Sequence, residues 1–107
     1  MVMISKEDLI RIVRNYFPDT KSEVKEKRGI VLEGKISISE GKFIHIYVNR
    51  LTGKKSYGLI FQGKRIFGYD NYKYWHCHPY DNPNQHLTCD EPLIEKFFEE
   101  VKSFLSK

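Results

Sequence analysis

The chain has 107 residues, of which 40% are hydrophobic and 30% are charged, with 18 Lys and Arg against 14 Asp and Glu. This length predicts a single domain, residues 1–107, with enough apolar residues for a core that needs no disulfide. No apolar run reaches the roughly 20 residues of a membrane-spanning helix, and MVMISKEDL lacks the pattern of a signal peptide. We therefore expect a cytoplasmic protein without a membrane partner. Its net charge of +4 favours acidic partners such as nucleic acid.

A helix is predicted near the N-terminus. Ser5 is a suitable N-cap, Asp8 occupies the third helical position, and Ile4 can pack on Leu9. An apolar stripe at helical spacing follows, formed by Leu9, Val13, Tyr16 and Phe17. Pro18-Asp19 ends this helix. The charged stretch KSEVKEKR (21–28) is then either a loop or an edge strand beginning near Val24.

The middle of the chain changes to the period of β-strands. GIVLEGKISI (29–38) alternates in polarity, and SYGLIFQ (56–62) and RIFGYD (65–70) are joined by a short hairpin turn. FIHIYV (43–48) is β-branched and aromatic throughout, which predicts a central strand buried on both faces, with His45 as a core or sheet-face residue. The connections are short, so the four strands form an antiparallel meander.

The C-terminal end is predicted to be helical. Asp90, Glu91 and Pro92 are typical of a helix start. Apolar residues then repeat every three or four positions: Leu93, Ile94, Phe97, Phe98, Val101, Phe104 and Leu105. The predicted fold class is α+β: an N-terminal helix, a four-stranded antiparallel meander, a His-rich loop, and a C-terminal helix packed on the sheet.

Alternate connections of a meander lie at the same end of the sheet. Basic residues of the strand ends and loops should therefore converge on Asp70 and the histidine segment. They are Lys25, Lys27, Arg28, Arg50, Lys54 and Lys55. A basic rim beside the aromatic rings of Tyr74 and Trp75 suits phosphates and unstacked bases. The alternative is that lysines line any loop end because loops are solvated.

The segment YWHCHPYDNPNQHLTCDEP (74–92) holds three of the four histidines and both cysteines. Its residues include zinc-ligand types, but their spacing matches no standard zinc pattern. Whether zinc binds stays open for His76, Cys77, His78, His86 and Cys89. In the cytoplasm the cysteines are expected to be thiols or ligands rather than a disulfide. A structural alternative is a loop whose histidines bond backbone carbonyls, with prolines fixing an extended path.

The same histidines could also be catalytic. Imidazoles titrate near neutrality and can act as base and acid on a phosphodiester without a metal cofactor. His76, His78 or His86 would transfer protons, and Asp70 would orient one imidazole. Basic side chains would hold the phosphate charge; the candidates are Arg28, Arg50, Lys54, Lys55 and Arg65.

The stretch LIFQGKRIFGYDNYKYWHCHPYDNPNQH (59–86) resembles the TumE-type toxins of prokaryotic toxin–antitoxin pairs. Tyr69-Asp70-Asn71 is similar to the aromatic-Asp-Asn that ends a strand in that family. His76, His78 and Pro79 look like its first histidine group, and His86 resembles a remnant of the second. The resemblance covers roughly residues 43–86, and Gly68 stands where an arginine is expected.

The resemblance implies a toxin-like protein that acts on RNA or translation and is neutralised by a separate antitoxin. Combined with the residues above, it predicts a component of a toxin–antitoxin module that binds RNA and cleaves it with metal-independent histidine chemistry. No cofactor is expected, and a homodimer is an open alternative to a single chain. Two other hypotheses remain: a non-catalytic module that binds RNA or an acidic protein, and a small zinc-stabilised domain.

Overall fold

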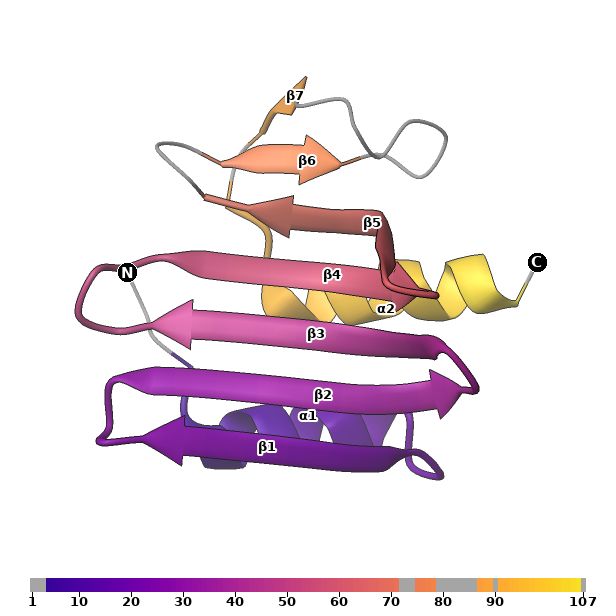
Figure 1. Cartoon of the computed structure of the whole chain (residues 1–107), viewed down its shortest axis with the longest axis horizontal. Coiled ribbons are helices and arrows are strands. Elements are labelled where there is room, and N and C mark those ends of the chain that lie inside the picture. The colour runs from indigo at the N-terminus through magenta and orange to yellow at the C-terminus, as the bar shows by residue number, and fades with distance from the viewer. Residues whose placement is uncertain (1–3, 72–74, 79–86, 90, 107) are drawn as a thin grey trace.

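The computed structural model describes residues 4–71, 75–78, 87–89 and 91–106. These residues form an antiparallel sheet in which each strand pairs with the next one in the chain, while both helices lie against one face (Figure 1). The elements are α1 (Lys6–Tyr16), β1 (Lys21–Lys27), β2 (Val31–Ser39), β3 (Lys42–Asn49), β4 (Lys55–Phe61), β5 (Lys64–Asp70), β6 (His76–His78), β7 (Leu87–Thr88) and α2 (Ile94–Leu105). The predicted α+β class is confirmed. No helix in the described part of the chain is long and apolar enough to cross a membrane.

Helix α1 begins at the predicted cap. The Ser5 hydroxyl accepts a hydrogen bond from the Asp8 backbone N–H at 3.0 Å, and the Asp8 carboxylate accepts one from the Ser5 N–H at 3.5 Å. This reciprocal arrangement satisfies two backbone donors at the helix start. The helix buries Leu9 and its neighbours against β2, where a Cβ at Gly34 would lie 3.1 Å from Leu9 Cδ2. Gly34 therefore allows the helix to approach the sheet closely.

The sheet contains the four predicted strands and three more. The charged stretch after α1 is an edge strand, β1, whose register runs from Lys21 opposite Ser37 to Lys27 opposite Val31. The histidine segment, predicted as a loop, contains two short strands, β6 and β7, which extend the sheet beyond β5, so the prediction is wrong for those residues. Backbone N–H and C=O groups at the edge of β5 would otherwise lack strand partners, and pairing with β6 satisfies them.

Strand β3 is buried on one face only. Ile44, Ile46 and Val48 point toward the helices and are fully buried, whereas Phe43, His45 and Tyr47 alternate with them and are half-buried. The prediction of burial on both faces is therefore wrong. The physical reason is that α1 and α2 both cover the same side of the sheet (Figure 1). The other side, which we call the open face, is exposed to solvent.

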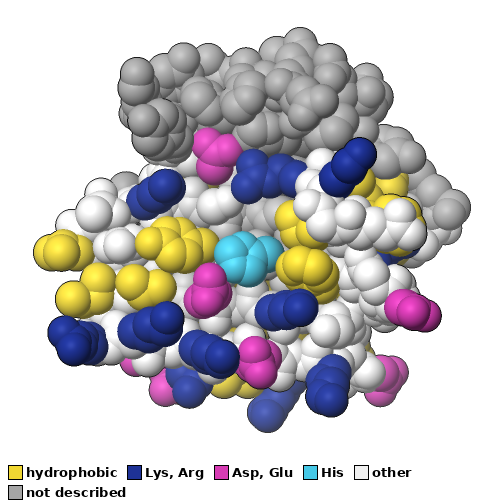
Figure 2. Space-filling model, in the orientation of Figure 1, with side chains coloured by type: hydrophobic (Ala, Val, Ile, Leu, Met, Phe, Trp, Pro, Cys, Tyr) yellow, Lys and Arg dark blue, Asp and Glu magenta, His cyan; other side chains and the backbone are white. Residues whose placement is uncertain are grey.

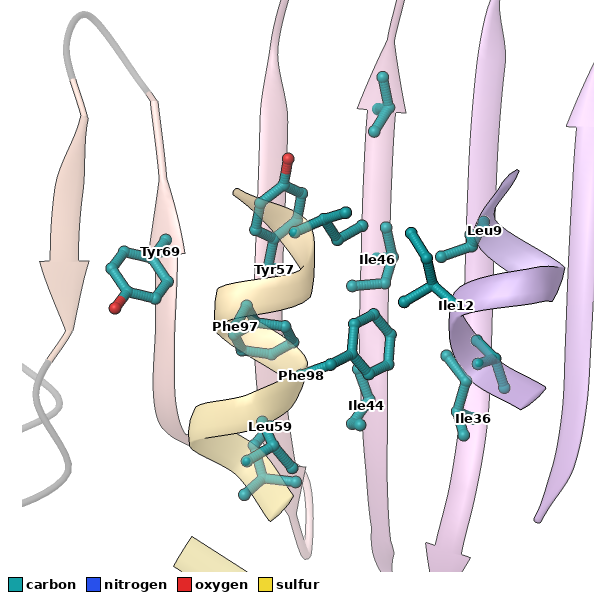
Figure 3. Packing of buried hydrophobic residues seen from close by; sticks show 14 of the residues in the cluster. Leu9, Ile12, Ile36, Ile44, Ile46, Tyr57, Leu59, Tyr69, Phe97 and Phe98 are labelled. Atoms are coloured by element: carbon teal, nitrogen blue, oxygen red, sulfur yellow. The ribbon is translucent and has the colours of Figure 1, made fainter. Parts of the chain in front are cut away.

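The core lies between the helices and β2–β5. Phe97 and Phe98 of α2 are fully buried and point at the sheet (Figure 3). The Phe97 ring stacks on Phe67 with centroids 5.7 Å apart, and Tyr69 meets it edge-on at 6.3 Å. The apolar stripe predicted for α2 is thus confirmed at Ile94, Phe97, Phe98 and Val101, whereas Leu93, also predicted to belong to it, is 74% exposed. These aromatic contacts fix the helix over β4 and β5, and hold the C-terminal end of β5 in place.

The predicted start of α2 is too early. The helix begins at Ile94, with Leu93 as an N-cap that makes no side-chain cap hydrogen bond. Glu91 does not serve the helix end, because its carboxylate bonds Lys55 of β4 at 3.0 Å. The acidic residue that suggested a helix start instead attaches the incoming chain to the sheet.

Candidate functional site

The motif Tyr69-Asp70-Asn71 ends β5, and its side chains have three different partners. The Tyr69 hydroxyl donates to Glu100 of α2 at 2.6 Å. Burial raises the pKa of Tyr69, and the bond to Glu100 raises it further. Asn71 accepts from the Lys55 backbone N–H at 2.7 Å and donates to the Gly53 carbonyl at 2.8 Å. The residues on both sides of Asp70 are therefore anchored, one to the core and the other to the loop before β4.

Asp70 itself is paired with Arg65. The distance from Arg65 Nη1 to Asp70 Oδ2 is 3.1 Å, and Arg65 Nη2 donates to Ser56 Oγ at 2.9 Å. The Arg65 and Asp70 side chains are 31% and 17% exposed. Within the described part of the chain, the guanidinium uses two of its five N–H donors in these bonds. A planar, partly exposed guanidinium that is held in place is well suited to contact a phosphate.

Two paired glycines lie beside Arg65, and one of them, Gly58, leaves room for its side chain. Gly58 of β4 pairs directly with Gly68 of β5. A Cβ at Gly58 would lie 3.2 Å from Arg65 Nε, and a Cβ at Gly68 would overlap the backbone carbonyl oxygen of Tyr57. Gly68, which stands where the family resemblance suggests an arginine, is therefore required by the close backbone approach of these two strands. Arg65 provides the guanidinium in this region instead.

The register brings the histidine strand beside this cluster. In the backbone pairing of β5 with β6, His76 is opposite Asp70 and His78 is opposite Gly68. The predicted proximity of Asp70 to the first two histidines is therefore present at the level of the backbone. His86 and Tyr74, the other predicted site residues of this segment, lie outside the described residues.

His45 is a histidine that the sequence reasoning set aside. Its Nε2 lies 3.1 Å from Glu33 Oε2 across β2 and β3, and the two side chains are 37% and 42% exposed. The residue directly opposite His45 on β4 is Gly58. The alternation of FIHIYV could have indicated this placement, since Ile44 and Ile46 must share one face and His45 the other.

Lysines and aromatic rings occupy the rest of the open face. Figure 2 shows basic side chains spread over this face around a histidine. The Lys35 ammonium lies 4.6 Å from the centre of the Phe43 ring. A shallow hollow of about 290 Å³ is lined by Glu23, Lys25, Glu33, Lys35, Phe43 and His45. The combination of ammonium groups and flat rings is typical of surfaces that bind single-stranded nucleic acid.

The predicted basic rim is present in part, because some of its residues are exposed at the expected end of the sheet and others are bonded within the fold. The turn before β2, the loop between β3 and β4, and the end of β5 lie at the same end of the sheet, as expected (Figure 1). Arg28 is exposed in that turn and Lys54 in that loop. Arg50, in contrast, donates to Glu26 at 2.8 Å, to the Gly29 carbonyl at 3.0 Å and to the Ile4 carbonyl at 2.9 Å. Arg50 therefore holds the chain together at this end.

Lys55 and Trp75 also make contacts within the folded chain that limit their access to a ligand. Lys55 is only 4% exposed and its ammonium bonds Glu91. The Trp75 ring packs against Tyr57, with centroids 5.9 Å apart, and it belongs to the edge of the core. A buried ammonium cannot reach an external phosphate, and a ring packed on the core has less surface for stacking. We therefore leave Arg50, Lys55 and Trp75 out of the proposed binding surface.

Cys89 is disulfide-bonded, so the expectation of a thiol or ligand is wrong for this residue. A thiolate, not a disulfide sulfur, is the form of cysteine that binds zinc. Among the described residues, no group of three or more His, Cys, Asp and Glu side chains could hold a metal ion. The zinc hypothesis thus loses one of the ligands on which it depended.

The fold and the open face together define a small α+β protein with a polar face on one side of an antiparallel meander. The chain belongs to the family described as Toxin TumE, whose model matches residues 6–105. This match extends the resemblance from the middle of the sequence to nearly the whole chain. No curated protein and no solved structure matches the chain significantly.

Proposed function

We propose that this member of the toxin family is the toxin of a toxin–antitoxin module and that it acts on RNA as a metal-independent endoribonuclease. Family membership supports the toxin component. The observation that carries the RNA proposal is the Arg65–Asp70 pair, which lies on the open face in register with the histidine strand. A cognate antitoxin protein would be the natural partner that neutralises this face.

The chemistry follows from the residue types at this site. Arg65 would bind the scissile phosphate and stabilise the negative charge that grows on it during cleavage. His76 and His78 would transfer protons, and Asp70 would orient one imidazole by accepting its N–H. Arg65 is bonded to both Asp70 and Ser56, so its guanidinium is positioned before substrate arrives. Such preorganisation is the main way in which a protein stabilises a charged transition state.

The open face would also provide the RNA path. Lys21, Lys25 and Lys35 occupy neighbouring positions on β1 and β2, and Phe43 and Tyr47 follow on β3. Ammonium groups would neutralise phosphates, while the rings would stack with unpaired bases. This surface favours single-stranded RNA over a duplex, whose bases are not available for stacking.

A second candidate function is a binding module without catalysis. The observation that favours it is that lysines and rings of β1–β3 line a shallow hollow that includes no histidine of β6. Such a module would bind RNA or an acidic protein, and substitution of His76 and His78 would leave binding intact. Formation of a cleavage product distinguishes the two functions.

The test is incubation of the purified protein with labelled single-stranded RNA in EDTA. The variants are the double substitution His76→Ala/His78→Ala and the single substitution Arg65→Ala. Arg14→Ala is the matched control, because Arg14 is an exposed arginine on α1. RNA binding is measured in parallel by fluorescence anisotropy, and folding is checked by circular dichroism.

We expect the wild type and Arg14→Ala to cut RNA, and the double variant and Arg65→Ala to lose cleavage. If the wild type binds RNA but forms no product, the binding module replaces the nuclease. If it neither binds nor cuts RNA, the proposed action on RNA is wrong.

A further inference from the structure

A row of register positions crosses the open face from His45 to β6. His45 pairs with Gly58, Gly58 pairs with Gly68, and Gly68 pairs with His78. The two central positions, Gly58 and Gly68, have no side chains, so neither residue projects from the sheet surface along this strip. A Cβ at Gly58 would meet Arg65 Nε at 3.2 Å and Ile60 Cδ1 at 3.4 Å, which shows that these two side chains occupy the space above Gly58. His45 forms its other end.

The bond to Glu33 fixes the tautomer of the neutral His45 ring. A carboxylate can only accept, so the neutral imidazole that bonds Glu33 Oε2 carries its proton on Nε2. Nδ1 is then the ring nitrogen with a lone pair. The side chain is 37% exposed, which makes this face of the protein accessible to a bound molecule. The pair thus has the arrangement of a base and the carboxylate that orients it.

His45 is also close to the phosphate position offered by Arg65. Gly58 is directly opposite His45, and neighbouring strands are about 4.8 Å apart. The Arg65 side chain lies over Gly58. A phosphate bound to Arg65 would therefore lie about one strand spacing from the imidazole. The ribose attached to that phosphate would reach His45.

We propose that His45 is a catalytic base of this site and that Glu33 is its positioning residue. The inference rests on the proposed action on RNA. His45 Nδ1 takes the proton of the ribose 2′-hydroxyl, and the 2′-oxygen forms a bond to phosphorus. The bond from phosphorus to the 5′-oxygen breaks, and that oxygen takes a proton from the imidazolium of His76 or His78, which regains a proton from solvent. The products are a 2′,3′-cyclic phosphate and a 5′-hydroxyl, and His45 returns its proton to solvent.

The experiment measures kcat and KM for a short single-stranded RNA with His45→Ala, Glu33→Ala and Glu33→Gln, together with analysis of the product ends. Ser37→Ala is the control, since Ser37 is an exposed residue of the same sheet face on β2. Loss of a general base should lower kcat by about 100-fold or more in His45→Ala, with KM little changed. Added imidazole should restore at least about tenfold of that loss in His45→Ala and none in Arg65→Ala.

The two Glu33 variants separate positioning from simple stability. The glutamine amide oxygen can still accept from His45 Nε2, so Glu33→Gln should keep more of the wild-type kcat than Glu33→Ala. Each variant must keep the melting temperature of Ser37→Ala. This comparison is informative because an exposed ion pair of this kind contributes little to stability.

Four outcomes would overturn the inference. If the wild type cuts RNA and His45→Ala does so at the same rate, His45 is not catalytic while the proposed function stands. If His45→Ala is slow but imidazole does not restore it, or if the products carry 3′-hydroxyl and 5′-phosphate ends, His45 is not the base described here. If the wild type cuts no RNA at all, the proposed function fails and the inference falls with it.

Discussion

Lys55 and Glu91 connect β4 to the segment that enters α2, with Nζ and Oε1 3.0 Å apart. The two partners differ in their environment, because the Lys55 side chain is 6% exposed and that of Glu91 is 40% exposed. Removing either partner breaks the same ion pair. Without Glu91, the charge that remains is the buried ammonium of Lys55. Without Lys55, it is the hydrated carboxylate of Glu91.

We therefore predict unequal costs for the two substitutions. Glu91→Gln leaves a buried ammonium without its carboxylate and should lower the free energy of unfolding by about 3 kcal/mol. Lys55→Met keeps the packed stem and leaves a carboxylate that water reaches, so its cost should be about 1 kcal/mol or less. Urea unfolding of both single variants and the double variant measures the difference. Equal costs would show that the burial of Lys55 does not govern this pair.

The paired glycines give a second prediction. Gly68→Ala places a methyl group onto the Tyr57 carbonyl oxygen and should cost at least about 3 kcal/mol, because the backbone must move. Gly58→Ala meets only the side chains of Arg65 and Ile60, so its cost should be about 1 kcal/mol. It should nevertheless reduce RNA cleavage, since Arg65 must shift. Thermal unfolding ranks the two variants, and the reverse ranking would contradict the strand packing described above.

Stability should fall at alkaline pH through two core tyrosines. Burial raises the pKa of both Tyr57 and Tyr69; the charges of Glu91 and Glu95 add to the effect at Tyr57, and Glu100 does so at Tyr69. Each hydroxyl keeps its proton in the folded protein above pH 10, where the unfolded chain loses it. Their contribution is therefore complete below about pH 10 and is lost as pH rises from there through the folded pKa.

Tyr69→Phe tests this dependence. The variant should lose about 1 kcal/mol at pH 7 with its bond to Glu100, yet its stability should fall less steeply above pH 10. The slope should be smaller than that of the wild type by about 1.4 kcal/mol per pH unit. Urea unfolding between pH 8 and 11 measures it, with Tyr57→Phe as a second variant. Parallel curves for variant and wild type would contradict the raised pKa.

Arg50 should matter for stability rather than for RNA. A lysine ammonium cannot span the Glu26 carboxylate and the carbonyls of Gly29 and Ile4, so Arg50→Lys should cost about 1–3 kcal/mol. Arg14→Lys, on the exposed surface of α1, should stay within about 0.5 kcal/mol of the wild type. RNA affinity should be unchanged in both. A loss of affinity with intact stability would return Arg50 to the binding surface.

Much of the fold could be predicted because its signals are local. The Ser5–Asp8 cap and the apolar stripe of α2 depend on spacings of three and four residues, which sequence displays directly. The meander followed from short connections between strands. The start of α2 failed because Glu91 bonds a residue 36 positions away, and no local pattern contains that partner.

The site was harder to predict, because it depends on which side of the sheet the helices cover. His45 lies among apolar residues in sequence, and its exposure follows from the absence of a described helix on the open face. The roles of Arg50 and Arg65 were likewise set by partners on other strands, Glu26 of β1 and Ser56 of β4. Composition shows that arginines are present. Only the register shows which arginine holds the fold together and which one lies beside a histidine strand.

The meander also determines the order in which the chain can assemble. Every strand hydrogen-bonds to its neighbour in sequence, so the sheet can grow one hairpin at a time at a small cost in loop closure. The contacts of Tyr16 with Phe98 and Glu99, in contrast, join residues more than 80 positions apart. During synthesis α1 and the first strands emerge long before α2 exists. The surface beside Tyr16 is therefore uncovered until α2 has been synthesised, and we expect the pairing of the two helices to complete folding.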